Sequence, residues 1–234
     1  MDIPLSQIKP FYPSPPPGTD TNTRPAEPPT IQSTITTLNL LPHIEGGYFV
    51  ETDRDPLRIP NPFLSGSYKI PENAVTARDD RDRDNTTRSA STTIFYYLTP
   101  GSPLGAFHRN RGRTVHTLHR GRGRYVIIHA DEVINQQGQG SKKKARIETF
   151  VVGHDISKGE KLQWIVEGGK YKASFLLPDR EGDPEGRTEG LLISETVVPG
   201  FEFADHDFMR PETMDELLTP EQVKELNWML RKVD

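Results

Sequence analysis

A succession of short segments rich in β-branched and aromatic residues, separated by turns containing Gly, Pro or Asp, most constrains how this chain can fold. These segments are 92–99, 113–119, 124–130, 146–152, 162–167, 171–177 and 191–198. Residues of these types favour strands, whereas Gly, Pro and Asp favour turns. Many short strands at close spacing are typical of a sandwich or a barrel, so the sequence predicts an all-β fold. The sequence RGRG at residues 120–123 further predicts a tight hairpin between two of the strands.

Helices are predicted only near the two ends of the strand-rich region. Thr30 can cap a short first helix, and Thr219 caps a second one, with Pro220 in its first turn and Gln222 three residues after the cap. The apolar positions recur at helical spacing in both: Ile31, Ile35 and Leu38 in the first helix, and Val223, Leu226 and Leu230 in the second. Each helix therefore has one apolar face that can pack on the outside of a barrel.

Composition divides the chain into a core domain and polar extensions. Residues 1–29 contain nine of the 21 prolines, which predicts an extended or disordered arm. Residues 30–210 form the predicted barrel domain, with polar, loop-like insertions at 53–90 and 135–145. The remaining residues, 211–234, form the C-terminal helical segment.

Several classes of protein and site are disfavoured by composition. The chain has no cysteine, which excludes a disulfide framework, a thiolate zinc site and a cysteine nucleophile. A net charge of −4 argues against nucleic acid as a partner. The arginines between Arg109 and Arg124 are a local exception, either a solvated hairpin or an anion-binding rim. No apolar run is long enough to span a membrane and the N-terminus does not resemble a secretory signal, so we expect a cytoplasmic protein without a membrane partner.

Four segments resemble the signature segments of a known family. They are LLPHIEGGYFVET (40–52), YYLTPGSP (96–103), AFHR (106–109) and VPGFEFADHDF (198–208). Over residues 34–210 the chain resembles the small, uncharacterised cupin-5 family, a domain of unknown function related to sugar-epimerase-like and storage-protein cupins. The resemblance implies a cupin barrel, that is, a double-stranded β-helix or jelly roll, and a homodimer.

The general cupin pattern holds a metal ion with two His and a Glu from a first motif and a His from a second. Placed on that pattern, this chain has His108 at the first His, Asn110 at the second His, Thr114 at the Glu and Lys172 at the last His. Asn and Thr are weak ligands for transition metals, and an ammonium group repels a cation. We therefore expect no metal and no cofactor at these positions.

Acid–base chemistry without a metal is the alternative for the barrel interior. Residues two apart on a strand share a face, so His116 faces inward together with Thr114, and His108 shares a face with Asn110. Lys172 would approach from across the barrel, and an ammonium in a dry interior favours the neutral imidazole. A neutral imidazole is a competent general base. His108, His116 and Lys172 are thus the predicted catalytic residues of an isomerase, epimerase or cyclase acting on a small organic molecule.

The remaining candidates are assigned to ligand binding. The substrate-binding candidates are Glu45, Tyr48, Tyr96, Asn110, Arg113 and Thr114. Either Phe95 or Tyr96 lines the interior, because adjacent residues of a strand point to opposite faces. For His43 and His206 a structural hydrogen bond is the expected role. Two alternatives remain open: non-catalytic binding of a small ligand such as an anionic sugar or nucleotide, and a storage-like barrel whose histidines only fill the interior.

Overall fold

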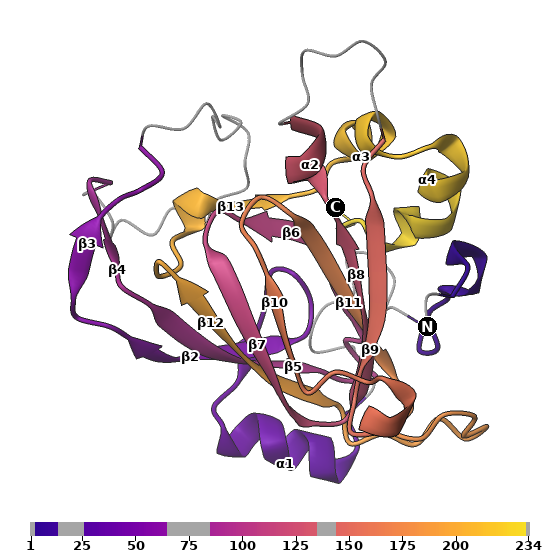
Figure 1. Ribbon diagram of the computed structural model, residues 1–234. Helices are drawn as coiled ribbons and strands as arrows, with labels where there is room; N and C mark the ends of the chain where they lie inside the picture. The colour runs from indigo at the N-terminus through magenta and orange to yellow at the C-terminus, as the bar shows by residue number, and fades with distance from the viewer. Residues whose placement is uncertain (1–2, 14–25, 65–84, 135–143, 233–234) are drawn as a thin grey trace.

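Two antiparallel β-sheets build the body of the protein (Figure 1). The computed structural model describes residues 3–13, 26–64, 85–134 and 144–232. The first sheet consists, in order, of β1 (Leu41–Pro42), β2 (Tyr48–Arg54), β5 (Thr92–Leu98), β12 (Leu191–Val198), β7 (Arg113–Arg120) and β10 (Gln163–Val166). The second sheet consists of β13 (His206–Phe208), β6 (Leu104–Asn110), β11 (Tyr171–Leu177), β8 (Arg122–Ile128) and β9 (Ile147–Val152). The seven strands expected from composition are all confirmed, and a short pair, β3 (Arg58–Pro60) and β4 (Thr87–Ser89), lies apart from both sheets.

The turn at residues 120–123 is not the predicted hairpin. It leads from β7 in the first sheet to β8 in the second, because β12 and β10 already occupy both edges of β7. Gly121 has a φ of 81°, and a Cβ atom there would lie 2.0 Å from the carbonyl oxygen of Gly190. Glycine therefore permits the chain to turn from one sheet to the other at this position. The local sequence alone does not distinguish such a corner from a hairpin.

The interior lies between the two sheets and is largely aromatic and aliphatic. Strict alternation along β12 and β7 sends every second side chain inward. The residues that share this cluster include Tyr96, Leu118, Trp164, Leu191 and Ile193 from the first sheet and Tyr125, Ile127, Val152 and Leu176 from the second. The site described below lies among inward positions of the same strands.

Helices cover the outside of both sheets. In Figure 1, α1 (Pro29–Thr37) lies below the first sheet, where Ile31 packs with Leu40 and Tyr97. Its N-cap is Pro28 and not the expected Thr30. A short α2 (Ala130–Ile134), which the sequence did not predict, follows β8.

The C-terminal helices α3 (Pro211–Leu217) and α4 (Pro220–Leu226) pack against the outer face of the second sheet. The predicted capping box of Thr219 and Gln222 is confirmed, since each side chain bonds to the backbone of the other residue. Of the predicted apolar stripe, Leu226 is fully buried and Val223 and Leu230 pack beside it. In the described part of the chain, no helix is long and apolar enough to cross a membrane.

The start of the chain differs from the expected free arm. Residues 3–13 pack on the barrel: Ile8 is fully buried, Lys9 pairs with Glu225 at 2.7 Å, and the Tyr12 hydroxyl donates to the Gly186 carbonyl at 2.6 Å. The prolines restrict the backbone but do not prevent the apolar side chains between them from burying surface. Residues 14–25 lie outside the described residues.

The two expected insertions are also more ordered at their ends than polar composition suggests. In the first, β3 and β4 pair with each other and the side chain of Arg88 is buried; residues 65–84 lie outside the described residues. In the second, residues 135–143 lie outside the described residues, but the Ala145 side chain is buried and its amide donates to the Leu217 carbonyl.

Candidate active site in the barrel

His108 and Lys172 are direct cross-strand neighbours. His108 lies on β6 and Lys172 lies opposite it on β11. Directly opposed residues on antiparallel strands have Cβ atoms about 5 Å apart, so both side chains enter the interior side by side. Both are buried, with exposures of 6% and 3%.

Lys172 does not offer a free positive charge. Its ammonium donates to Glu195 Oε2 at 2.6 Å and to His116 Nε2 at 2.8 Å. Glu195 reaches it from β12 and His116 from β7, so the group joins both sheets. Burial opposes the ionisation of Glu195, but the Lys172 ammonium outweighs it and holds the pKa of that carboxyl well below its ordinary value. Burial and the same ammonium lower the pKa of His116, which keeps the imidazole neutral.

Glu45 forms a second polar centre with three histidines. Its carboxylate lies 2.9 Å from His206 Nε2, 3.3 Å from His108 Nε2 and 3.6 Å from His43 Nδ1. Burial of Glu45 disfavours its charge, but the surrounding imidazoles, including the hydrogen bond that His206 Nε2 donates, lower the pKa of the carboxyl below its ordinary value. The carboxylate is therefore ionised in the folded protein.

The turn that carries Glu45 is fixed against β6. The Glu45 carbonyl accepts a bond from the Ala106 amide at 2.8 Å. Gly46 follows with a φ of 104°, and a Cβ atom there would lie 2.0 Å from the Leu104 carbonyl oxygen. Only glycine permits this close approach, which explains the Gly in the EGGYF segment.

The protonation state of His108 follows from its hydrogen bonds. Its Nδ1 lies 2.9 Å from the Ala106 carbonyl oxygen, an acceptor only, so Nδ1 carries the proton. Burial, opposed by Glu45, lowers the pKa of His108 to about 3, so the ring is neutral near pH 7. A neutral ring that is protonated at Nδ1 has its lone pair on Nε2, the atom that faces Glu45.

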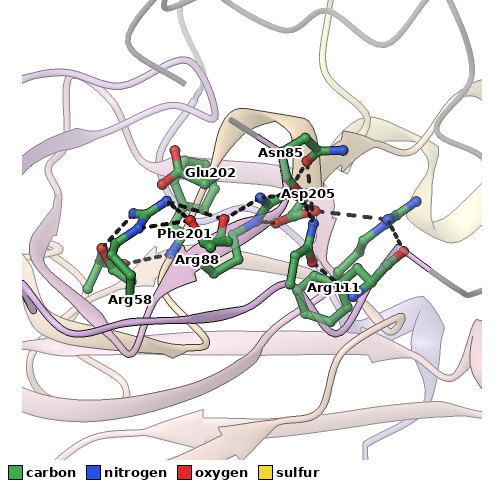
Figure 2. Close-up of polar contacts among 12 residues, drawn as sticks. Arg58, Asn85, Arg88, Arg111, Phe201, Glu202 and Asp205 are labelled. Atoms are coloured by element: carbon green, nitrogen blue, oxygen red, sulfur yellow. Dashed lines mark hydrogen bonds and ion pairs between the residues drawn. The ribbon is translucent and has the colours of Figure 1, made fainter. Parts of the chain in front are cut away.

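A buried ion pair holds the segment that supplies His206. Arg88, on β4, donates through Nε to Asp205 Oδ2 at 2.6 Å, and Arg111 approaches the other oxygen at 4.0 Å (Figure 2). Asp205 immediately precedes His206, and the side chains of Arg88 and Asp205 are only 1% and 5% exposed. Figure 2 also shows Asn85 beside Arg88. The guanidinium of Arg88 donates to the backbone carbonyl and to the side-chain oxygen of Asn85. The polar insertion thus orders one wall of the site.

Most of the predicted site residues come together in the interior. Along with His108, His116 and Lys172, the inward positions include Thr114, which is 1% exposed, and Glu45. Tyr96, and not Phe95, faces inward, and its hydroxyl donates to the Gly46 carbonyl at 2.8 Å.

Asn110 lies directly opposite His206 on neighbouring strands. Its buried Oδ1 accepts no hydrogen bond among the described residues. A buried acceptor without a partner is uncommon in proteins, so this oxygen is a candidate contact for a ligand.

Two predicted binding residues do not reach the interior. Tyr48 packs outward in the cluster of Ile31 and Leu40, because the neighbouring residue Phe49 takes the inward position on β2. Arg113 has a half-exposed side chain and lies 3.3 Å from Glu167, because it precedes the inward-facing Thr114 on β7. These two assignments are wrong.

Sequence reasoning missed Glu195, and it gave His43 and His206 a structural hydrogen bond without identifying Glu45 as their common partner. Glu195 shares the inward face of β12 with Ile193 and Val197, and a charged residue among apolar inward positions was the signal that could have revealed it. The two histidines were detectable only through their proximity to Glu45, which sequence spacing does not encode.

The residues at the general cupin metal positions do not fit a metal ion. Lys172 brings an ammonium to the position of the last His, where it is already bonded to Glu195 and His116. Of the other positions only His108 offers a strong ligand atom, since Asn110 and Thr114 stand in place of a His and a Glu.

Comparisons with known proteins agree with the fold. Over 208 residues, 88% of each chain, the protein is 40% identical to an uncharacterized protein of Saccharomyces cerevisiae. A hypothetical protein from Leishmania major has a solved structure with a TM-score of 0.63 and 24% identity, covering 86% of this chain and 98% of that one. Protein SO0799 from Shewanella oneidensis gives a TM-score of 0.57 at 19% identity, covering 87% and 98%. Residues 32–209 match the family model described as Cupin superfamily (DUF985), and the chain belongs to that family.

Proposed function

We propose that this cupin binds a small organic carbonyl compound in the barrel and moves a proton at the carbon next to the carbonyl group. The reaction class is that of an isomerase, epimerase or cyclase, and it needs no metal ion. The observation that carries this proposal is the direct opposition of His108 and Lys172 on β6 and β11. His108 offers a neutral proton acceptor, and Lys172 offers an ammonium N–H donor held in place by its pairing with Glu195.

The proposed step uses the lone pair of His108 Nε2. It accepts the proton, the C–H electron pair moves into the new C=C bond, and the carbonyl oxygen becomes an enolate oxygen. The remaining N–H of Lys172 donates to this oxygen, and a placed donor of this kind stabilises developing charge. Glu45, 3.3 Å from Nε2, stabilises the imidazolium that forms. Return of the proton to another carbon or to the other face completes an isomerisation or epimerisation.

We assign the direction of approach from the small differences in side-chain exposure. The side chains of Glu45 and His108 are 9% and 7% exposed, whereas that of His116 is 0% exposed. A ligand would therefore arrive from the side of Glu45 and His108. His116 would act through Lys172, as a residue that positions the ammonium.

Non-catalytic binding of a small ligand is the second candidate. It is favoured by the nearly complete burial of Lys172 and by the Glu195 carboxylate that already neutralises it. That pairing weakens the case for an anionic ligand such as a sugar phosphate or nucleotide. A homodimer, implied by family resemblance, is part of either proposal.

Hydrogen–deuterium exchange into a substrate tests the proposal. The full chain, treated with a chelator, is incubated in D₂O with small ketones, aldoses and keto acids, and loss of the C–H signal is followed by NMR. We expect exchange that falls by about 10²–10⁴-fold in His108→Gln, the usual contribution of a placed general base. His119→Gln, at an outward position on β7, is the matched control.

A ligand that raises the melting temperature but shows no exchange would support the binding module instead. Exchange that survives in His108→Gln would contradict the assigned base.

A further inference from the structure

The three residues Glu45, His108 and His206 present one ligand atom each to a common point. These atoms all lie within 4.8 Å of one another, and all three residues are buried. We propose that they form a site for one divalent transition-metal ion, such as zinc, manganese or iron(II). Glu45 and His206 lie outside the general cupin pattern, so this would be a different ligand set that shares only His108 with it.

The ligand atoms are close enough for one ion to bring them together by small side-chain movements, since they all lie within 4.8 Å of one another. Protein nitrogen and oxygen ligands lie about 2.1 Å from such ions, so neighbouring ligand atoms on one ion are about 3.0–3.5 Å apart. Without an ion, Glu45 Oε1 lies 2.9 Å from His206 Nε2, with which it forms a hydrogen bond, and Glu45 Oε2 lies 3.3 Å from His108 Nε2. The two imidazoles are nearly parallel, with ring centroids 5.4 Å apart.

The orientation of His108 favours a cation over a hydrogen bond. Because Nδ1 donates to the Ala106 carbonyl, Nε2 faces a carboxylate oxygen with its lone pair. Two acceptors that face each other at this distance repel, and a cation between them removes the conflict. A backbone carbonyl that fixes the tautomer is also the usual outer-shell partner of a metal-bound histidine.

The charges near the site also favour a cation. The Lys172 ammonium lies beside His108, but Glu195 compensates its charge, and no lysine or arginine in the described parts of the chain lies within ion-pair distance of Glu45. The neighbouring His43 accepts a bond from the Glu45 amide through Nδ1. A buried carboxylate is normally paired or bound to a metal, and this one has only imidazoles around it.

The surrounding structure holds the ligands and leaves room in the coordination sphere. His206 is anchored through Asp205 and Arg88, and Glu45 through the turn docked on β6. Three protein ligands leave positions for water or a ligand, as in catalytic metal sites. The unpartnered Oδ1 of Asn110, opposite His206, can accept a hydrogen bond from such a water.

This inference does not rest on the proposed function. An ion and a proton compete for the same lone pair on His108, so the metal-loaded and the acid–base forms are separate states. The chelated protein tests the proton transfer, and metal binding is measured without any turnover.

The test is a direct binding measurement on the full chain, purified without a histidine tag and freed of metal by a chelator. Zinc and manganese chlorides are titrated by calorimetry, and the ion content after gel filtration is measured by mass spectrometry. We expect one ion per chain, with affinity at least a hundred-fold weaker in Glu45→Gln and His206→Gln. His119→Gln, away from the site, should bind as the wild type does.

Cobalt gives an independent measurement if a variant does not fold. Wild-type protein with Co²⁺ should develop visible absorption bands typical of nitrogen and oxygen ligands at low coordination number. No ion retained at micromolar concentration, no cobalt bands, or unchanged affinity in both ligand variants would each overturn the inference. Binding in wild type together with proton exchange that occurs only in the loaded protein would confirm the ion site and refute the metal-independent reaction.

Discussion

Lys172 and Glu195 form an ion pair of 2.6 Å in the barrel interior, with side-chain exposures of 3% and 9%. The pair joins β11 of the second sheet to β12 of the first, and His116 accepts a further bond from the same ammonium. A buried charge that loses its partner is costly, so each member depends on the other.

Lys172→Met should therefore destabilise the protein by about 3–5 kcal/mol, the usual cost of breaking a buried pair from one side. The double variant Lys172→Met with Glu195→Gln removes both charges and should recover part of that loss. Urea unfolding of the wild type, the single variant and the double variant gives the three free energies. A single variant that loses less than about 1 kcal/mol would show that water reaches Glu195.

Arg88→Met should be destabilising to a similar degree, about 3–5 kcal/mol, because Asp205 would be left buried without its guanidinium. Arg58→Met, on the neighbouring strand β3, is the matched control. Arg58 is exposed and bonds to Thr87 and Ser89, so we expect its loss to cost less than about 1 kcal/mol. Equal losses in the two variants would contradict the special role of the Arg88–Asp205 pair.

Strand composition and the alternation of residues predicted much of the fold. The seven β-rich segments became strands, and alternation placed Thr114 and His116 inward, as the sequence indicated. Local sequence patterns predicted the wrong structure where one residue type is compatible with two kinds of turn. Gly121 fits both a hairpin and a corner between sheets, and the choice depends on which strands occupy the edges of β7.

The candidate site was only partly predictable, because some of its residues meet only through contacts between segments distant in the sequence. The convergence of His116 and Lys172 could be inferred from strand faces, because each residue belongs to a regular strand. Glu45 and His206 come from a turn and from the start of a three-residue strand, and they meet only through the tertiary fold. The sequence likewise gave no sign that Arg88, in a charged segment, would be buried against Asp205.

Acid should destabilise the protein, and the sign follows from the pKa shifts. The pKa values of His108 and His116 are lowered by burial, so below their ordinary pKa of 6.5 the unfolded chain binds protons that the folded chain does not. The lowered pKa of Glu195 adds the same effect below 4.5. Stability should thus fall from about pH 6.5 downward and continue to fall toward pH 3, near the folded pKa of His108.

Urea unfolding in the presence of a chelator, at a series of pH values from about 8 to about 3.5, measures this dependence. The variant His116→Gln should have a shallower decline between about pH 6.5 and 5, because one buried imidazole no longer titrates. A wild-type stability that stays level down to about pH 4 would contradict the buried, neutral state of both histidines.

Ile8→Ala should lower the free energy of unfolding by about 2–4 kcal/mol, because it deletes a fully buried side chain from the cluster that includes Phe107 and Met229. Gln7→Ala, at an exposed neighbouring position, is the control and should change stability by less than about 0.5 kcal/mol. Thermal and urea unfolding of the two variants separates packing of the segment from a general effect of mutating it. If Ile8→Ala were as stable as the control, the first residues would behave as the free arm that their proline content suggests. A loss of the expected size would instead make residues 3–13 part of the folded domain, with the apolar contacts of Ile8 outweighing the restriction that the prolines impose.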